Sequence, residues 1–191
     1  MNLSSIVLAM VISLPPAYTD REETGREARM RTIAEAVTQA TERACCEGYG
    51  ESCEPIWNGR PEDLAALIVT KGWWESRFAL NVHEGKCKPY ECDPAKSMRG
   101  HITHLARTPW QFQRTGFSAP FWNDMVGTGL QPTRNAAWVA ATILSRGYNA
   151  CRSFEGALAW YAVGRCNYSK AGNRHVTFRK LQTIVDSKPA S

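Results

Sequence analysis

The sequence predicts a mainly α-helical fold. Apolar residues recur at spacings of three and four in several segments, helix start and stop signals flank them, and no segment keeps the alternation of a half-buried strand. The chain has 191 residues, of which 43% are hydrophobic, so we expect one domain with an apolar core. This composition, with a net charge of only +5, excludes an intrinsically disordered chain.

The segment over residues 5–14 is short and apolar, and two prolines follow it. It has the length of the apolar region of a signal peptide, but no basic residue precedes it and it lacks a clear cleavage site. Three interpretations stay open: an export signal, a helix packed on the domain, and a membrane anchor. Residues 15–27 are expected to be a linker or an exposed helix start, so we separate residues 1–27 from a main domain over residues 28–191.

The first amphipathic helix is predicted over residues 27–44, where Met30, Ile33 and Val37 recur on one face. A loop containing Cys, Gly and Pro follows over residues 45–59.

The second helix is predicted to begin at Pro61, because proline fits the first helical position, and to run to about Phe78. Residues 83–108 carry scattered Gly, Pro, Cys and charge, which indicates a long loop or a small hairpin.

Three more helices are predicted over residues 135–148, 153–163 and 177–185. Ser153 is expected to cap the second of these helices and Gly164 to end it.

Seven cysteines are many for a reducing compartment. They form three local groups: Cys45, Cys46 and Cys53; Cys87 and Cys92; and Cys151 and Cys166. We expect three local disulfides that leave either Cys45 or Cys46 free, with buried free thiols as the alternative.

Glu75 is the most informative residue of the second helix. At about 100° per residue, it lies within roughly 20° of Leu64, inside the apolar stripe. A carboxylate there must be paired, protonated or placed in a cleft, because bare burial of its charge is costly. Desolvation favours the protonated form of a carboxylic acid, which a general acid at a glycosidic oxygen requires. The alternatives are an ion pair with a buried arginine, and a surface position beyond an early helix end.

A family resemblance appears in three segments. Ala65–Phe78, with its Glu-Ser-x-Phe ending, resembles the first motif of soluble lytic transglycosylases and goose-type lysozymes. Thr108–Gln111 resembles their Gly-Leu-Met-Gln motif, and Trp160–Gly164 resembles their Ala-Tyr-Asn-Ala-Gly motif. The resemblance covers residues 62–168 and implies a lysozyme-like α-helical domain.

The resemblance makes Glu75 the catalytic acid that protonates the glycosidic oxygen. Ser76 would position the substrate, Gln111 would hydrogen-bond to it, and Tyr161 would orient Glu75 or the N-acetyl group.

Aromatic residues supply two further candidates for substrate contacts. Trp73 and Trp74 point about 100° apart on a helix, so one of them is expected to line a cleft, and Trp74 is the candidate. Trp110 stands where the family has Met, and it is the second candidate. Ala162 replaces the family's Asn, which puts one substrate contact in doubt.

The implied function is that of a lytic transglycosylase, which cleaves the MurNAc–GlcNAc β-1,4 bond of peptidoglycan and forms 1,6-anhydromuramyl products. Such an enzyme uses one glutamate, first as acid and then as base. The expected partner is a peptidoglycan glycan strand, and we expect a monomer with no nucleic acid, no stable membrane span and no cofactor. The expected location is extracytoplasmic: periplasmic, secreted or phage-associated.

Two other functions stay open. A lysozyme-type muramidase needs a second carboxylate, for which Glu84, Glu91 and Asp93 are candidates, although loop charges are usually solvated. The residue at Ala162 also leaves room for a glycan-binding or assembly protein without catalysis.

A structural zinc site is the remaining alternative. Cys87, Cys92, His101 and His104 have the right chemistry, but their spacing matches no strong zinc pattern. A disulfide beside surface histidines is the simpler interpretation.

Overall fold

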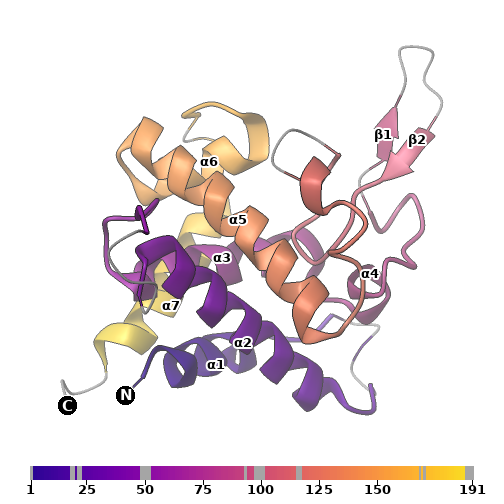
Figure 1. Ribbon diagram of the computed structural model, residues 1–191, viewed down its shortest axis with the longest axis horizontal. Coiled ribbons are helices and arrows are strands. Elements are labelled where there is room, and N and C mark those ends of the chain that lie inside the picture. Colours follow the sequence, from indigo (N-terminus) through magenta and orange to yellow (C-terminus); the bar gives the residue numbers. More distant parts are fainter. Residues whose placement is uncertain are drawn as a thin grey trace.

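The structure is a computed structural model that describes residues 2–17, 20, 23–47, 53–92, 94–96, 102–114, 118–167, 169 and 171–187. Over these residues the chain is mainly helical, as the sequence predicts (Figure 1). The elements are α1 (Leu3–Ser13), α2 (Arg26–Cys45), α3 (Pro61–Ser76), α4 (Leu80–His83), β1 (Pro94–Lys96), β2 (Ile102–Leu105), the 3-10 helix η2 (Ala119–Phe121), α5 (Leu130–Cys151), α6 (Phe154–Val163) and α7 (Gly172–Asp186).

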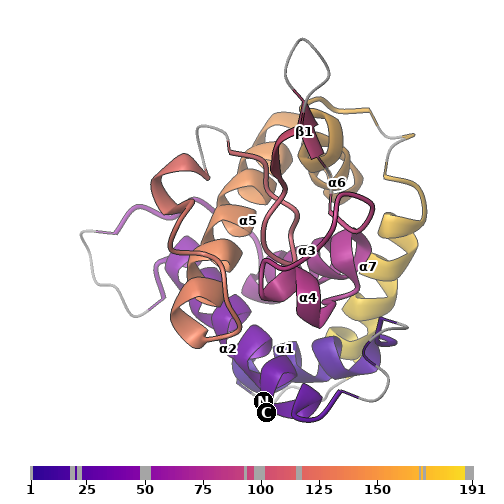
Figure 2. The ribbon, with the colours of Figure 1, turned by 90° about the vertical axis from the view of Figure 1, so that its right-hand side faces the viewer.

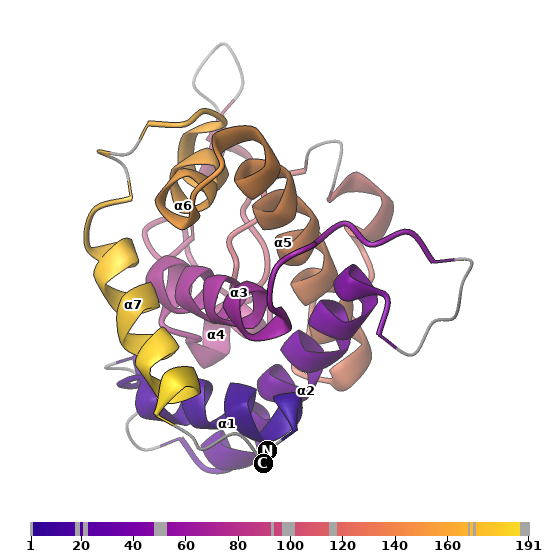
Figure 3. The ribbon, with the colours of Figure 1, turned by 90° about the vertical axis from the view of Figure 1, so that its left-hand side faces the viewer.

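α3 is the central helix, and α1, α2, α5, α6 and α7 all contact it (Figure 3). Every residue from Asp63 to Trp73 is buried, as expected of a helix that is surrounded on all sides. Large buried side chains from the surrounding helices complete this core: Met10, Met30, Ile33, Leu144, Leu158 and Phe178. Glu75 follows two residues after this buried stretch, where α3 leaves the core.

The predicted helix signals are present. Ser153 caps α6 by accepting a hydrogen bond from the Gly156 N–H at 3.0 Å, and Gly164 ends it with a φ of 69°. α5 and α7 each begin five residues before their predicted starts. In α5 the extension includes Pro132, which the first turn tolerates because its N–H groups have no helical partner there.

The predicted loop or hairpin over residues 83–108 contains a two-stranded antiparallel hairpin. β1 pairs with β2 through Pro94 opposite Leu105, and the register shifts between Ala95 and Lys96. The hairpin projects away from the helices (Figures 1 and 2). The chain between the hairpin and η2 returns to the helical body, where it carries the second motif.

The apolar N-terminal segment forms α1, which packs against α2, α3 and α7. Val7, Met10 and Val11 are buried in the same core as α3, so α1 has the packed arrangement, the second of the three open interpretations. Among the described residues, no helix combines the length and hydropathy needed to cross a bilayer.

The prediction of three local disulfides is confirmed. Cys46 pairs with Cys53, Cys87 with Cys92, and Cys151 with Cys166, which leaves Cys45 as the free thiol. The first of these bonds ties the chain after α2 back to the end of that helix.

Candidate functional site

A cavity of about 350 Å³ lies beside the last turn of α3. Its described lining residues come from four helices and from the chain at 111–113: Lys71, Glu75, Gln111, Phe112, Gln113, Ile143, Tyr161, Ala162 and Arg174. The Glu75 side chain is 15% exposed. The carboxylate that the helical pattern singles out therefore borders a cleft of the size that small ligands occupy.

Two cations contact Glu75. Lys71, one turn earlier on α3, donates to Oε1 of Glu75, and the Arg174 guanidinium lies 3.4 Å from the same oxygen. The Lys71 side chain is only 1% exposed, whereas Arg174 is 30% exposed. The ion-pair alternative for Glu75 is thus also realised, mainly with a buried lysine. Both contacts use Oε1, and no hydrogen bond among the described residues engages Oε2.

Tyr161 acts on Glu75 through Lys71. Its ring centroid lies 4.2 Å from Nζ of Lys71, a cation–π contact, while its hydroxyl donates to the Trp110 carbonyl at 2.8 Å. Burial raises the pKa of Tyr161 well above its usual range, and the negative charge of Glu75 adds to this. Tyr161 therefore stays a neutral phenol that fixes Lys71 against Glu75.

Gln111 reaches the cavity from a tight turn. Arg107 and Phe112 exchange both backbone hydrogen bonds at 2.9 Å across this turn. Thr108 and Gln111 have φ values of 69° and 55°, and left-handed conformations of this kind cost energy in residues other than glycine. The Gln111 side chain also donates to Sγ of Cys92 at 3.1 Å, which connects the turn to the Cys87–Cys92 disulfide.

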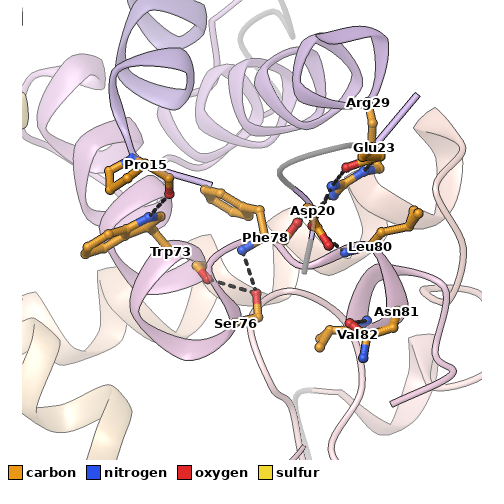
Figure 4. Close-up of polar contacts among 11 residues, drawn as sticks. Pro15, Asp20, Glu23, Arg29, Trp73, Ser76, Phe78, Leu80, Asn81 and Val82 are labelled. Atoms are coloured by element: carbon orange, nitrogen blue, oxygen red, sulfur yellow. Dashed lines mark hydrogen bonds and ion pairs between the residues drawn. The ribbon is translucent and has the colours of Figure 1, made fainter. Parts of the chain in front are cut away.

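The end of α3 is similarly strained. Arg77 and Phe78 adopt φ values of 55° and 53°, so the helix ends at Ser76 and not at the predicted Phe78. Ser76 stabilises this end, because its hydroxyl donates to the Gly72 carbonyl at 3.1 Å and accepts from the Phe78 N–H at 3.0 Å (Figure 4). Strained backbone therefore occurs close in sequence to both Glu75 and Gln111, as is common at functional sites.

The N-terminal part of the chain holds this strained end in place (Figure 4). Arg29 of α2 donates to the Phe78 carbonyl at 2.6 Å, and Asp20 and Glu23 balance its buried charge at 3.1 and 2.5 Å. Asp20 also accepts from the Leu80 N–H at 2.8 Å. Residues predicted to be a linker thus support the helix that carries Glu75.

Three of the predicted site residues, Glu75, Gln111 and Tyr161, line this one cavity. Ala162 lines it as well. The other three predicted site residues lie outside the cavity lining. Trp110 is fully buried and donates to the Ile68 carbonyl at 2.9 Å. 

Trp74 donates to the Thr177 hydroxyl at 2.8 Å, and Ser76 caps α3. These two residues and Trp110 support the walls of the site.

Sequence reasoning missed Lys71 and Arg174. The contact of Lys71 with Glu75 could have been predicted from the sequence, because a lysine four residues before a glutamate lies on the same helix face. No sequence feature predicts the contact of Arg174 with Glu75, since its helix is far from α3 in the sequence and its position depends on how α7 docks.

Glu84 and Glu91, two of the three candidates for a second carboxylate, are not among the described lining residues of this cavity. Glu84 pairs with Lys86 at 3.2 Å, and Glu91 accepts from the Lys88 N–H at 2.8 Å. Asp93 lies outside the described residues.

The alternative of a zinc site that uses Cys87 and Cys92 as ligands is wrong. Cys87 and Cys92 are joined to each other, so neither supplies a thiolate. His101 and the side chain of His104 lie outside what the structure describes. Among the described side chains, no cluster of three or more potential ligands is present.

Comparison with family models, with curated proteins and with solved structures found no match to this chain.

Proposed function

We propose that the chain is a peptidoglycan-cleaving lytic transglycosylase with a lysozyme-like fold, and that Glu75 is its single acid and base. The observation that carries the proposal is the convergence of Glu75, Gln111 and Tyr161 on one cavity. These residues come from the three segments that resemble the family's motifs, and they are distant from one another in the sequence. A shared cavity is what the implied chemistry requires of them.

In the proposed reaction, the Glu75 carboxylate first takes up a proton from solvent, in exchange for part of its ion pair with Lys71 and Arg174. It then gives this proton to the glycosidic oxygen, and the bond from that oxygen to C1 of the muramyl sugar breaks. The resulting carboxylate takes the proton of the C6 hydroxyl as that oxygen bonds to C1. The 1,6-anhydro ring forms without water, and Glu75 regains its proton. Oε2 is the oxygen suited to both transfers, since Lys71 and Arg174 hold Oε1.

A one-carboxylate mechanism suits the lining of the cavity. Among the described lining residues, Glu75 is the only carboxylate, whereas a hydrolase of the usual type places a second one about 5–9.5 Å away. This favours the transglycosylase over the muramidase.

Two observations favour a second candidate, a glycan-binding protein without catalysis. Lys71 and Arg174 already compensate the charge of Glu75, and Ala162 lines the cavity where the family has Asn. A structural ion pair would look the same in its contacts, so activity decides between the two functions.

The deciding experiment is clearing of a purified cell-wall suspension by the protein and by its Glu75→Gln variant. We expect roughly 10²–10⁴-fold slower clearing by the variant, because it lacks the proton donor. Glu35→Gln, which changes an exposed carboxylate of α2, is the matched control and should keep full activity. Full activity of Glu75→Gln would contradict the site, and an inactive parent protein would favour the binding function.

Mass spectrometry of the released products separates the two enzyme classes. Anhydromuramyl ends support the transglycosylase, while reducing muramyl ends contradict it and favour the muramidase.

We also propose an extracytoplasmic location, because three disulfides form and persist in oxidising surroundings. Peptidoglycan, the proposed substrate, lies outside the cytoplasm.

A further inference from the structure

A hollow larger than the Glu75 cavity lies away from Glu75. Its volume is about 700 Å³, and it is formed by α2, α5 and the chain at residues 53–56. On α5, the hollow is lined by Arg134 and Trp138, which point about 180° and 140° away from Ile143 of the Glu75 cavity. The two sites are therefore on different sides of α5.

Arg43 of α2 is exposed and lies over an aromatic ring in this hollow. Its guanidinium carbon lies 4.0 Å from the centre of the Trp138 ring, on the opposite helix. Stacking fixes the plane of a guanidinium while its N–H groups stay directed outward. Among the described residues, no carboxylate forms an ion pair with Arg43. Arg43 therefore has a cation–π contact with Trp138 and keeps donors available for a carboxylate.

Arg134 supplies a second guanidinium, which is exposed. It donates to Gln131 at 2.5 Å on its own helix and to Gln39 at 3.4 Å on α2. Glu54 is the only carboxylate among the described lining residues, against two arginines. The described lining therefore carries a positive surplus, and its side-chain amides, although bonded to neighbouring side chains, keep further donor and acceptor capacity for sugar hydroxyl groups.

The wall opposite α5 is covalently anchored. The Cys46–Cys53 disulfide fixes its start, and the Ile56 N–H donates to the Ala44 carbonyl at 2.9 Å. Figure 3 shows this segment running across α5 on its way to α3. The hollow is thus a pre-formed feature, as ligand sites usually are.

A second hollow of about 260 Å³ extends the surface along α5. It shares Ile56 with the first hollow and is lined by Thr142, Ser145 and Asn149. These residues follow Trp138 at spacings of four, three and four, so they continue the same helix face. An elongated ligand fits this arrangement better than a single small anion does.

We propose that the hollow between α2 and α5 binds a glycan strand with free carboxylates, through Arg43 stacked on Trp138 and through Arg134. The choice of glycan rests on the proposed function. Peptidoglycan strands that have lost their stem peptides carry a lactyl carboxylate on each muramyl sugar. Nucleic acid is disfavoured, because it is typically bound by clustered cations that follow a phosphate backbone. The site would hold one part of a strand while Glu75 acts on another part or on a neighbouring strand.

The test is NMR titration of the ¹⁵N-labelled Glu75→Gln variant, with the Trp138 indole signal assigned by Trp138→Phe. The probe is a set of peptidoglycan strands freed of stem peptides by an amidase. Chitin hexasaccharide serves as a neutral glycan, and polyglutamate and single-stranded DNA serve as other polyanions. We expect the Trp138 signal to shift with the peptide-free strands and much less with the three other probes.

The paired variant Arg43→Met/Arg134→Met should weaken binding of the strands by about tenfold or more, since it removes hydrogen bonds from charged donors. Arg31→Met/Lys180→Met removes the same charge from exposed positions outside the hollow and should bind like the parent. Thermal unfolding checks that both variants are folded.

Equal shifts with the neutral glycan, equal or stronger shifts with polyglutamate or DNA, or unchanged binding by the paired variant would overturn the inference. Failure of the proposed function is distinguishable. A parent protein that shifts at Trp138 but never cleaves strands contradicts catalysis alone, while cleavage without a Trp138 shift contradicts this site alone.

Discussion

Lys71 is a fully buried cation whose charge is balanced beside the proposed reaction site. It contacts Glu75 on one side and the face of the Tyr161 ring on another. Removing one partner of a buried ion pair leaves an uncompensated charge, which costs more than removing both partners. The same lysine therefore links the stability of α3 to the geometry of Glu75.

Lys71→Met is expected to destabilise the protein by roughly 3 kcal/mol, because Glu75 then keeps only the longer contact to Arg174. Lys71→Met/Glu75→Gln should be more stable than the single variant. Urea unfolding of both variants measures this difference, and a double variant that is no more stable than the single one would argue against compensation of charge by Lys71.

Cys45 is expected to be a slow nucleophile in the folded protein. Burial raises the pKa of its thiol to about 11, with the negative charges of Glu47 and Glu62 adding to this, so little thiolate is present near neutral pH. Alkylation by iodoacetamide at pH 8 should be much slower than alkylation of free cysteine.

Denaturation without reduction should expose one reactive thiol per chain, and Cys45→Ser should expose none. A count near seven in the unreduced parent protein would contradict the three disulfides.

At the scale of single elements, α3 depends on close packing at Gly72. A Cβ added there would lie 2.4 Å from Cε1 of Phe78 and 3.0 Å from Nε1 of Trp110. Both rings are buried, so neither has free space to move into. The approach of these rings to α3 sets where the helix ends and how the turn at 108–111 meets it.

Gly72→Ala is expected to destabilise the protein by about 1–3 kcal/mol, the usual cost of overpacking a core. It should also lower activity, because the displaced rings support both Glu75 and Gln111. Gly129→Ala is the matched control, since its Cβ would meet only Pro132 at ordinary contact distances of 3.7–3.8 Å. Equal melting temperatures for the two variants would refute this account of α3.

At the scale of the whole molecule, a buried histidine connects the loop region to the helical body. His83 of α4 is 1% exposed, and its Nε2 lies 2.8 Å from the Thr133 hydroxyl of α5. That hydroxyl donates to the Gly129 carbonyl at 2.7 Å, so it accepts from His83, which fixes the tautomer with Nε2 protonated. Nδ1, which would take up a second proton, is buried with no hydrogen-bond partner among the described residues, so burial keeps the ring neutral.

Acid is expected to destabilise the fold through His83. Burial, with a smaller effect of Arg29, lowers the pKa of His83 to about 3. The unfolded chain takes up this proton near pH 6.5, so the stability that the neutral ring contributes is full above that pH. It is lost as the pH falls from 6.5 to about 3, with a slope of at most about 1.4 kcal/mol per pH unit.

His83→Gln preserves a hydrogen-bond donor near the position of Nε2 but does not titrate. Denaturant unfolding at several pH values should show a shallower loss of stability for this variant between pH 6.5 and 3. Parallel pH curves for the variant and the parent would contradict this role of His83.

Local signals predicted much of the fold and part of the site. The caps of α6 and the disulfide pairs depend on residues close together in the sequence, so their pattern is readable there. The helical pattern also singled out Glu75, although α3 is buried on all sides from Asp63 to Trp73 and has no single apolar face. The early start of α7 and the burial of Trp110 were not readable, because both depend on packing between distant elements.

The amino-acid sequence alone determined a mainly helical chain with local disulfides, and it singled out Glu75 among the apolar residues of its helix. Only the tertiary structure decided that Arg174 meets Glu75 across 99 residues, that Tyr161 bonds to Trp110 across 51 residues, and that a cavity lies between them. The physical reason is the sequence distance over which each interaction acts, because helix caps and short disulfide loops involve residues that are close together in the chain. The walls of a site form only when helices dock and bury their faces against each other.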